Sequence, residues 1–289
     1  NIYSMLRKFK INKFGNLKLL SLSLLTVTFV LIANQEVWAA DVSTDIEAGA
    51  TTIDDTDTFI IDGTNDGVAG SNLTFSGANA RQLTVSSDGT DGDDIGNLGA
   101  INVADNNDTS TLIVNDASNG DGLVVIVNGA VTGDVATAAN DLDITIAANA
   151  TNDTGDTTLE FKGNLDIGAG VIVLTGDVDD TSILKFSGAG NQAVTGAILS
   201  TTNDVGSKII IANGANTVTF STAIGASSGN GVESLVVEAG TRGNATFSST
   251  VNANTADIDA DAGASVMDFN GNVEAVSYTH LTLPTNREV

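Results

Sequence analysis

The chain has 289 residues, a formal net charge of −25 and no cysteine. This negative charge opposes binding to nucleic acid or to anionic lipid, because both need clustered lysine and arginine. The lack of cysteine excludes a disulfide framework and a zinc–thiolate site.

The N-terminal segment has the features of a secretory signal. The first methionine is Met5, and we interpret residues 1–4 as upstream read-through. A basic stretch follows Met5, then an apolar run from Leu19 to Ala33, then small or aliphatic residues up to Ala39. The apolar run is shorter than the ~20 residues that span a bilayer as a helix. We therefore expect residues 5–39 to be a signal peptide cleaved after Ala39, with an uncleaved membrane anchor as the alternative.

The predicted mature segment, residues 40–275, has an unusual composition. It retains five of the 11 basic and 34 of the 36 acidic residues, a formal charge of −29, and it has no His, Trp, Tyr or Pro. A disordered chain has few β-branched residues, whereas here they are abundant and grouped in short runs. The composition therefore favours short β-strands.

Runs of β-forming residues recur along this segment, separated by clusters of Gly, Asn and Asp. The runs are 58–61, 73–75, 83–85, 111–114, 123–127, 142–146, 171–174, 208–211, 217–220 and 235–237. Linking stretches such as 62–67 and 115–122 contain residues that tolerate tight turns. No stretch between Asp41 and Ala275 shows a capped helical period.

One motif repeats, in which an aliphatic or small residue lies two positions before a phenylalanine and a small residue two positions after it. Its phenylalanines are Phe75, Phe161, Phe186, Phe220, Phe247 and Phe269. From Phe161 onward they are 25, 34, 27 and 22 residues apart. An irregular period of this size is typical of a solenoid with turns of variable length.

The repeat predicts an all-β fold, a right-handed parallel β-helix with irregular repeats of roughly 20–35 residues. Each coil would supply about three short strands, and inward residues such as Leu73, Phe75, Leu184 and Phe186 would stack on their equivalents in neighbouring coils. The alternative is a string of β-sandwich domains, because many short strands at 8–12-residue spacing fit that architecture too.

Two groups of aspartates are candidate calcium ligands. They are Asp88, Asp91, Asp93 and Asp94, and Asp177, Asp179 and Asp180. Calcium prefers oxygen ligands from carboxylates and backbone carbonyls. Neither group has the spacing of an EF-hand or of a calcium-binding nonapeptide repeat. Solvated acidic turns give the same pattern, and we favour them over specific calcium sites; calcium is the cofactor that these residues could bind.

A third acidic stretch, 255–261, reads as a strand with two different faces. Asp257, Asp259 and Asp261 would share one face, and Ile258 and Ala260 the other. The pattern favours an acidic outer ladder over an apolar inner face, and a metal-lined face is the alternative.

The segment lacks the side chains of most enzymes. Without His, Cys or Tyr, the usual pairs of nucleophile and base cannot form, and paired carboxylates are the main option left. We therefore expect residues 40–275 to be non-enzymatic.

The last residues differ abruptly in composition from those before them. Residues 276–289 hold His280 and Pro284, the sole His and Pro of the chain, and they resemble translated sequencing-adapter sequence. We expect this tail to be non-native and the natural protein to continue beyond Ala275.

With a secretory signal, a repeat rich in Gly, Asn, Thr and Asp, and motifs such as 184–188 and 267–271, residues 40–275 resemble autotransporter passengers of the rickettsial surface-antigen type. This resemblance implies an adhesin-like β-helix displayed outside a Gram-negative cell and anchored by a C-terminal outer-membrane barrel. Its partner would be an extracellular or cell-surface ligand that the sequence does not identify. Acidic, cysteine-free chains also resemble S-layer or type-I-secreted calcium-associated surface proteins, which are the alternative.

Overall fold

The structure is a computed structural model that describes most of the predicted mature segment. The described residues are 50–54, 56–61, 70–76, 80–87, 94–104, 108–116, 122–133, 141–148, 155–201, 205–225, 231–238, 243–259, 265–274 and 277–278. The chain divides into two compact units, Asn1–Asp41 and Val42–Val289, and every described residue belongs to the second. The predicted signal peptide lies outside the described residues.

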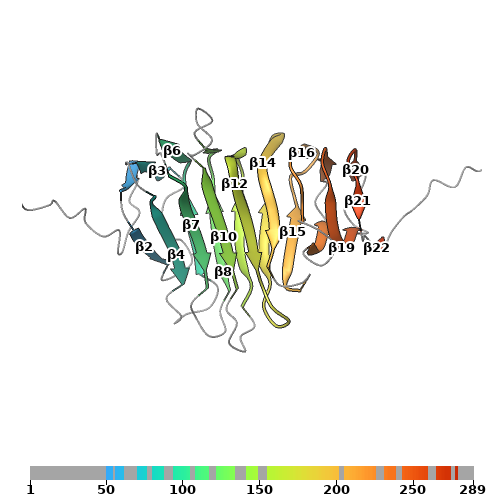
Figure 1. Ribbon diagram of the computed structural model, residues 1–289, viewed down its shortest axis with the longest axis horizontal. Coiled ribbons are helices and arrows are strands. Elements are labelled where there is room, and N and C mark those ends of the chain that lie inside the picture. Colours follow the sequence, from blue (N-terminus) through green and yellow to red (C-terminus); the bar gives the residue numbers. More distant parts are fainter. Residues whose placement is uncertain are drawn as a thin grey trace, which may run out of the picture. The chain divides into compact units, whose positions relative to one another are not determined.

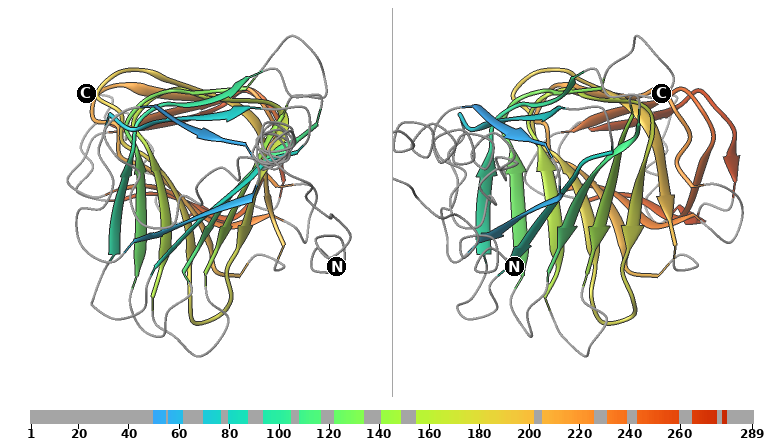
Figure 2. Two further views of the ribbon diagram at one scale, coloured as in Figure 1. Left: turned by 90° about the vertical axis from the view of Figure 1, so that its left-hand side faces the viewer. Right: turned by 60° about the vertical axis from the view of Figure 1, so that its left-hand side comes forward.

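The second unit is a β-solenoid. Its strands lie side by side in consecutive coils (Figure 1), and a view along the stack shows strands on three sides of a common interior (Figure 2). All strand pairs among the described residues are parallel, and each strand pairs with strands from the coils before and after it. The predicted parallel β-helix is confirmed. The alternative of tandem β-sandwiches is wrong, because sandwich sheets are built from antiparallel strands.

We number the three sides by their order along each coil. Face 1 consists of β1 (Ala50–Ile53), β3 (Asn72–Ser76), β6 (Ile101–Ala104), β9 (Val131–Thr132), the first parts of β12 (Leu165–Thr175) and β14 (Gln192–Ser200), β16 (Thr217–Phe220), β18 (Asn244–Phe247) and β20 (Val266–Phe269). Face 2 consists of β2 (Thr56–Ile61), β4 (Gln82–Ser87), β7 (Ser110–Asn115), β10 (Leu142–Ala147), the second parts of β12 and β14, the start of β19 (Val251–Ile258) and β21 (Val273–Glu274). Face 3 consists of β5 (Asp94–Leu98), β8 (Leu123–Val127), β11 (Thr157–Phe161), β13 (Ser182–Phe186), β15 (Ser207–Ile211), β17 (Val232–Val237), the rest of β19 and β22 (Ser277–Tyr278).

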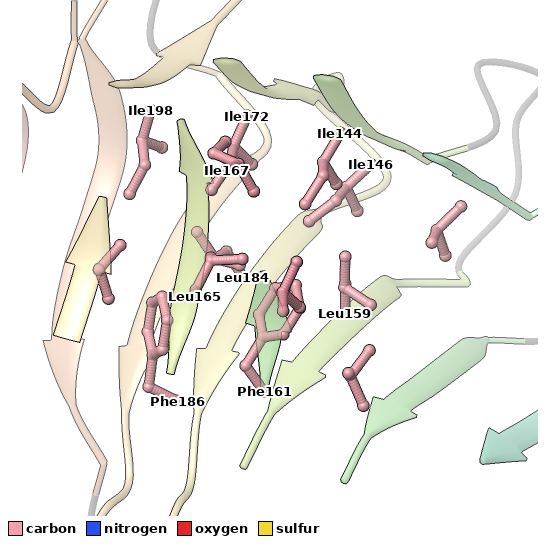
Figure 3. Close-up of a cluster of buried hydrophobic side chains, with 14 of the residues drawn as sticks. Ile144, Ile146, Leu159, Phe161, Leu165, Ile167, Ile172, Leu184, Phe186 and Ile198 are labelled. Carbon is pink, nitrogen blue, oxygen red and sulfur yellow. The ribbon is translucent and has the colours of Figure 1, made fainter. Parts of the chain in front are cut away.

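Side chains alternate between the interior and the surface along each strand. In β7 and β10 every second residue is buried, as expected because successive side chains of a strand point to opposite faces of the sheet. The inward side chains form one continuous hydrophobic cluster from Ile53 to Ala256, with Met267 and Phe269 packed against it. Figure 3 shows inward residues of all three faces meeting in this core, among them Ile146 and Leu159.

The expected stacking of inward residues on their equivalents is confirmed. Leu184 pairs with Leu159 in the preceding coil, and Phe186 pairs with Phe161 (Figure 3). All six motif phenylalanines point inward, and Phe269 alone is only partly buried. The motif does not mark one position of the coil, however. Phe161 and Phe186 lie on face 3, whereas the other four lie on face 1.

Glycine makes the bend between faces 1 and 2 where β12 and β14 run through the corner. Gly168 and Gly196 have φ angles of 66° and 108°, which L side chains rarely adopt. A Cβ on Gly196 would also lie 2.3 Å from Cγ1 of Ile167 in the preceding coil. The close approach of consecutive coils therefore requires glycine at this corner.

Two residues of the predicted adapter-derived tail are described. Ser277 and Tyr278 form β22, which pairs with Thr255 and Ala256 of β19. Backbone groups make this pairing, so it depends little on the identity of the side chains.

Candidate functional site

The described members of the two predicted calcium-ligand groups, Asp94, Asp177, Asp179 and Asp180, lie where the chain passes from face 2 to face 3. Residues 88–93 link β4 to β5, and residues 176–181 link β12 to β13, so both connections run from face 2 to face 3. The segments at this corner in the intervening coils also carry aspartates, including Asp116 and Asp156. We call this corner, which the structure describes at Asp94, Asp116, residues 155–156 and residues 176–181, the acidic edge.

Asp94 is too far from the turn that holds Asp177, Asp179 and Asp180 to share one ion with it. Asp94 pairs with Leu123, Leu123 with Thr157, and Thr157 with Ser182, which makes three steps along the ladder. At about 4.8 Å per step, Asp94 and Ser182 are separated by roughly 14 Å, whereas calcium–oxygen distances are about 2.3–2.6 Å. One ion could therefore not bind both Asp94 and the turn that precedes Ser182.

The second group is arranged as a turn. Oδ1 of Asp177 accepts hydrogen bonds from the backbone N–H groups of Asp179 at 2.8 Å and Asp180 at 3.0 Å. The N–H of Asp177 donates to the carbonyl of Asp180 at 3.0 Å. Asp179 is exposed and Asp180 is buried, so the three carboxylates face different surroundings. This geometry uses the Asp177 carboxylate to close the turn between two strands.

The first group is only partly described. Asp88, Asp91 and Asp93 lie outside the described residues, so calcium binding there stays a prediction. Asp94 begins β5 and is 1% exposed. Within the described ranges, no three acidic or histidine side chains gather in an arrangement that could hold a metal ion.

The acidic edge contains buried polar side chains, as the other corners of the solenoid do. Oγ of Ser87 donates to Oδ1 of the buried Asp116 at 2.5 Å. At the same corner in a later coil, Oγ1 of Thr157 at the start of β11 donates to the carbonyl of Ala147 at the end of β10 at 3.1 Å. These bonds satisfy polar groups at the corner where the chain leaves one sheet and enters the next, as buried polar groups require.

Many acidic and amide side chains brace one coil against the next. Oδ1 of Asp141 accepts from the N–H of Ala169 at 2.9 Å, and Oδ1 of Asp143 accepts from the N–H of Val171 at 2.9 Å. Four further side chains accept from a backbone N–H of the next coil in the same way. The acceptor and donor pairs are Asn72 and Ala100, Asn164 and Ala193, Asn191 and Thr217, and Asp156 and Thr181. These side chains were not among the predicted site residues. The signal for this role is an Asp or Asn placed 25–29 residues before the amide that it serves.

The third acidic stretch follows the expected alternation where the structure describes it. Ile258 packs against the core, and Asp257 lies on the outer side of β19 opposite Val236. Asp261 lies outside the described residues. Asp257 and Ile258 therefore take opposite sides of the strand as expected, and the ladder of three aspartates stays a prediction.

The outer sides of the faces differ in chemistry. Face 3 carries charges of both signs, with Glu160 opposite Lys185 in the ladder and Nζ of Lys185 3.1 Å from Oε2 of Glu238. Face 1 carries a row of hydroxyl, amide and carboxylate groups, namely Thr52, Thr74, Asn102, Thr132, Asp166 and Thr195. Face 2 carries threonine and aliphatic residues in register, namely Thr58, Thr84, Ile113, Thr145, Val173 and Leu199.

The chain is thus an acidic parallel β-solenoid. Its described residues share one apolar core, and the outward side chains of each face line up in rows from coil to coil. No protein-family model, no curated protein and no solved structure matches this chain. Across the described part of the chain, no helix has the length and apolar character needed to cross a membrane.

Proposed function

We propose that residues 40–275 form an exported, non-enzymatic surface protein, an adhesin-like passenger of the autotransporter type. The observation that supports this most is the continuous apolar core through successive coils. Because the interior is filled by side chains that stabilise the fold, other molecules would contact the outer faces of the solenoid. Repeat proteins use long surfaces of this kind for binding.

Two features of the sequence support export. Residues 5–39 have the pattern of a cleavable signal. The chain also contains no cysteine, so no disulfide can form before export and obstruct passage through a narrow pore. Stacked coils stabilise one another through their shared ladders and core, and such a fold does not require disulfides.

The acidic edge supports a second candidate, an S-layer or type-I-secreted surface protein associated with calcium. Carboxylates repeated along one edge lower their mutual repulsion by binding divalent cations. This candidate predicts ordered self-assembly that depends on calcium. Electron microscopy of the purified protein with and without calcium distinguishes the two candidates. An S-layer protein should form two-dimensional arrays only with calcium, whereas a passenger does not need such arrays.

Expression of the full chain in a Gram-negative cell tests export. We expect the exported product to begin at Ala40, as measured by intact mass. Ala39→Arg removes the small residue that signal peptidase requires and should block cleavage. Ala48→Arg, placed beyond the cleavage point, is the matched control and should be processed normally. A product that stays in the cytoplasm with residues 5–39 attached would contradict the proposal.

The intact gene tests the passenger assignment itself. Sequence recovered beyond codon 275 should encode a strand-rich outer-membrane anchor. A type-I secretion signal or an S-layer attachment domain at that place would instead favour the second candidate. Measurable turnover of a glycoside by the exported protein would contradict both.

A further inference from the structure

Two amide side chains are buried in consecutive coils at the corner where the chain passes from face 3 to face 1. Gln192 is the first residue of β14, and Asn213 lies two residues beyond the end of β15. They are 3% and 2% exposed. A buried amide is costly unless its polar atoms are hydrogen-bonded. The two residues can therefore be compared by the partners of their amide groups.

Both amide atoms of Gln192 are paired with backbone groups of the corner. Its Nε2 donates to the carbonyl of Phe161 at 3.0 Å and to that of Gly163 at 2.8 Å, and its Oε1 accepts from the N–H of Gly188 at 2.9 Å. Phe161 and Gly163 belong to the preceding coil. Gln192 thus joins two coils and satisfies its own amide.

The amide of Asn213 lacks such partners. No group in the described part of the chain forms a hydrogen bond with its Oδ1 or its Nδ2, although both atoms are buried. An unpaired buried amide lowers stability, because its atoms lose their bonds to solvent on folding. A cation would pair with Oδ1 and leave Nδ2 unpaired. Water can donate to Oδ1 and accept from Nδ2, so it fits both atoms.

The turn that carries Asn213 is held in place by other hydrogen bonds. The carbonyl of Asn213 accepts from the N–H of Asn216 at 3.4 Å and from its Nδ2 at 3.1 Å. The same Nδ2 donates to the carbonyl of Ala189 in the preceding coil at 2.9 Å. Gly214 has a φ of 66°, which L side chains rarely adopt. The backbone of the turn is thus fixed while the Asn213 side chain lies in the interior.

The equivalent position in the two preceding coils is glycine. Asn213 aligns with Gly188 and Gly163, because Ile211 pairs with Phe186 and Phe186 with Phe161. A Cβ on Gly163 would lie 2.4 Å from the carbonyl oxygen of Gly129, and one on Gly188 would lie 2.4 Å from that of Lys162. Asn213 does carry a Cβ. The backbone at its corner must therefore lie further from the preceding coil than at these glycines, which leaves room beside the amide.

From these observations we infer that the corner at Asn213 is a binding site for ordered internal water. Water at this corner donates to Oδ1 of Asn213 and accepts from Nδ2, as backbone groups do for the amide of Gln192 one coil earlier. Buried waters make about three hydrogen bonds each, so backbone groups of the corner complete the site.

A high-resolution crystal structure of the purified protein tests the inference. We expect density for at least one water molecule within hydrogen-bonding distance of Oδ1 or Nδ2 of Asn213, and none between the amide of Gln192 and its backbone partners. A dry corner would overturn the inference, and so would an Asn213 amide paired with protein groups alone.

Nuclear magnetic resonance gives an independent measurement in solution. The Nδ2 protons of Asn213 should show nuclear Overhauser effects to water, whereas the Nε2 protons of Gln192 should show none in the same sample. Equal signals from both side chains, or a signal from Gln192 alone, would contradict the site.

Two variants compare the stability that each amide provides. Gln192→Leu leaves two carbonyls and one N–H of the backbone without a partner, so it should lower the urea midpoint of unfolding clearly. Asn213→Leu has a similar volume and breaks bonds to water alone, so it should lower the midpoint less. Far-ultraviolet circular dichroism checks that each variant folds. A larger loss for Asn213→Leu would mean that protein groups pair with this amide, which overturns the inference.

Discussion

The rings of Phe186 and Phe220 meet edge to face with centroids 5.3 Å apart, although the two residues lie on different faces of the solenoid. Phe161 stacks on Phe186 along face 3, and Phe220, Phe247 and Phe269 continue the series along face 1. One aromatic ladder thus passes from one face to the next inside the core. The 34-residue interval between Phe186 and Phe220 is longer than its neighbours because it spans this change of face.

Removal of a ring from this ladder should destabilise the solenoid strongly. Phe186→Ala leaves a cavity in the core and should lower the free energy of unfolding by about 3–5 kcal/mol. Ile60→Ala, at a position that is 43% exposed, should lower it by less than about 1 kcal/mol. Urea denaturation followed by circular dichroism compares the two. Equal losses would contradict the placement of Phe186 in the core.

The contact between the two faces can be measured directly. In a double-mutant cycle, Phe186→Leu and Phe220→Leu should show a coupling energy of about 0.5–1.5 kcal/mol, the usual range for an aromatic pair. Phe186→Leu and Phe75→Leu, which lie in distant coils, serve as the control and should be additive. Additivity of the first pair would mean that the rings do not meet across the corner.

Gly196 should not tolerate a side chain. Gly196→Ala combines a φ of 108° with a Cβ 2.3 Å from Cγ1 of Ile167, and it should destabilise the protein by more than about 1 kcal/mol. At Gly190 a Cβ meets nothing within 4 Å, so Gly190→Ala should change stability by less than this. Thermal unfolding of both variants gives the comparison, and a neutral Gly196→Ala would argue against the tight corner.

The bracing of one coil by the next gives a test of the acidic side chains. Asp141→Ala leaves the N–H of Ala169 without its acceptor and should lower stability by about 1–3 kcal/mol. Asp141→Asn keeps an oxygen acceptor and should lose less. Asp179→Ala, at an exposed position of the acidic edge, is the control. If Asp179→Ala lowered the free energy of unfolding more than Asp141→Ala, the acidic edge would contribute more to stability than the hydrogen bond from Ala169 to Asp141.

Calcium chelation should have little effect on melting. The Asp177 carboxylate is already occupied by two backbone N–H groups, and the core and ladders hold the fold together. We expect scanning calorimetry with EDTA and with added calcium to give nearly the same, broad transition, because coils in a repeat fold interact mainly with their neighbours. A large upward shift with calcium would favour the S-layer or type-I-secreted candidate.

The candidate site was only partly predictable. Spacing and charge placed the aspartates in turns, and the structure puts Asp177 in a turn as expected. Spacing could not show that the segments around Asp94 and Asp177 share one edge, nor that roughly three ladder steps separate them. That relation depends on which strands pair, and turns of variable length hide the pairing from a fixed period.

By itself the sequence determined the fold class, the inward direction of residues such as Leu184 and Phe186, and the Gly- and Asn-rich corners. These features follow from local rules, namely the two-residue alternation of strands and the backbone freedom of turn residues. Only the tertiary structure decided that Phe161 and Phe220 lie on different faces and that Asp141 accepts a hydrogen bond from an amide one coil away. The physical reason is that register between coils is fixed by hydrogen bonding and packing between segments 22–34 residues apart, which no local pattern encodes.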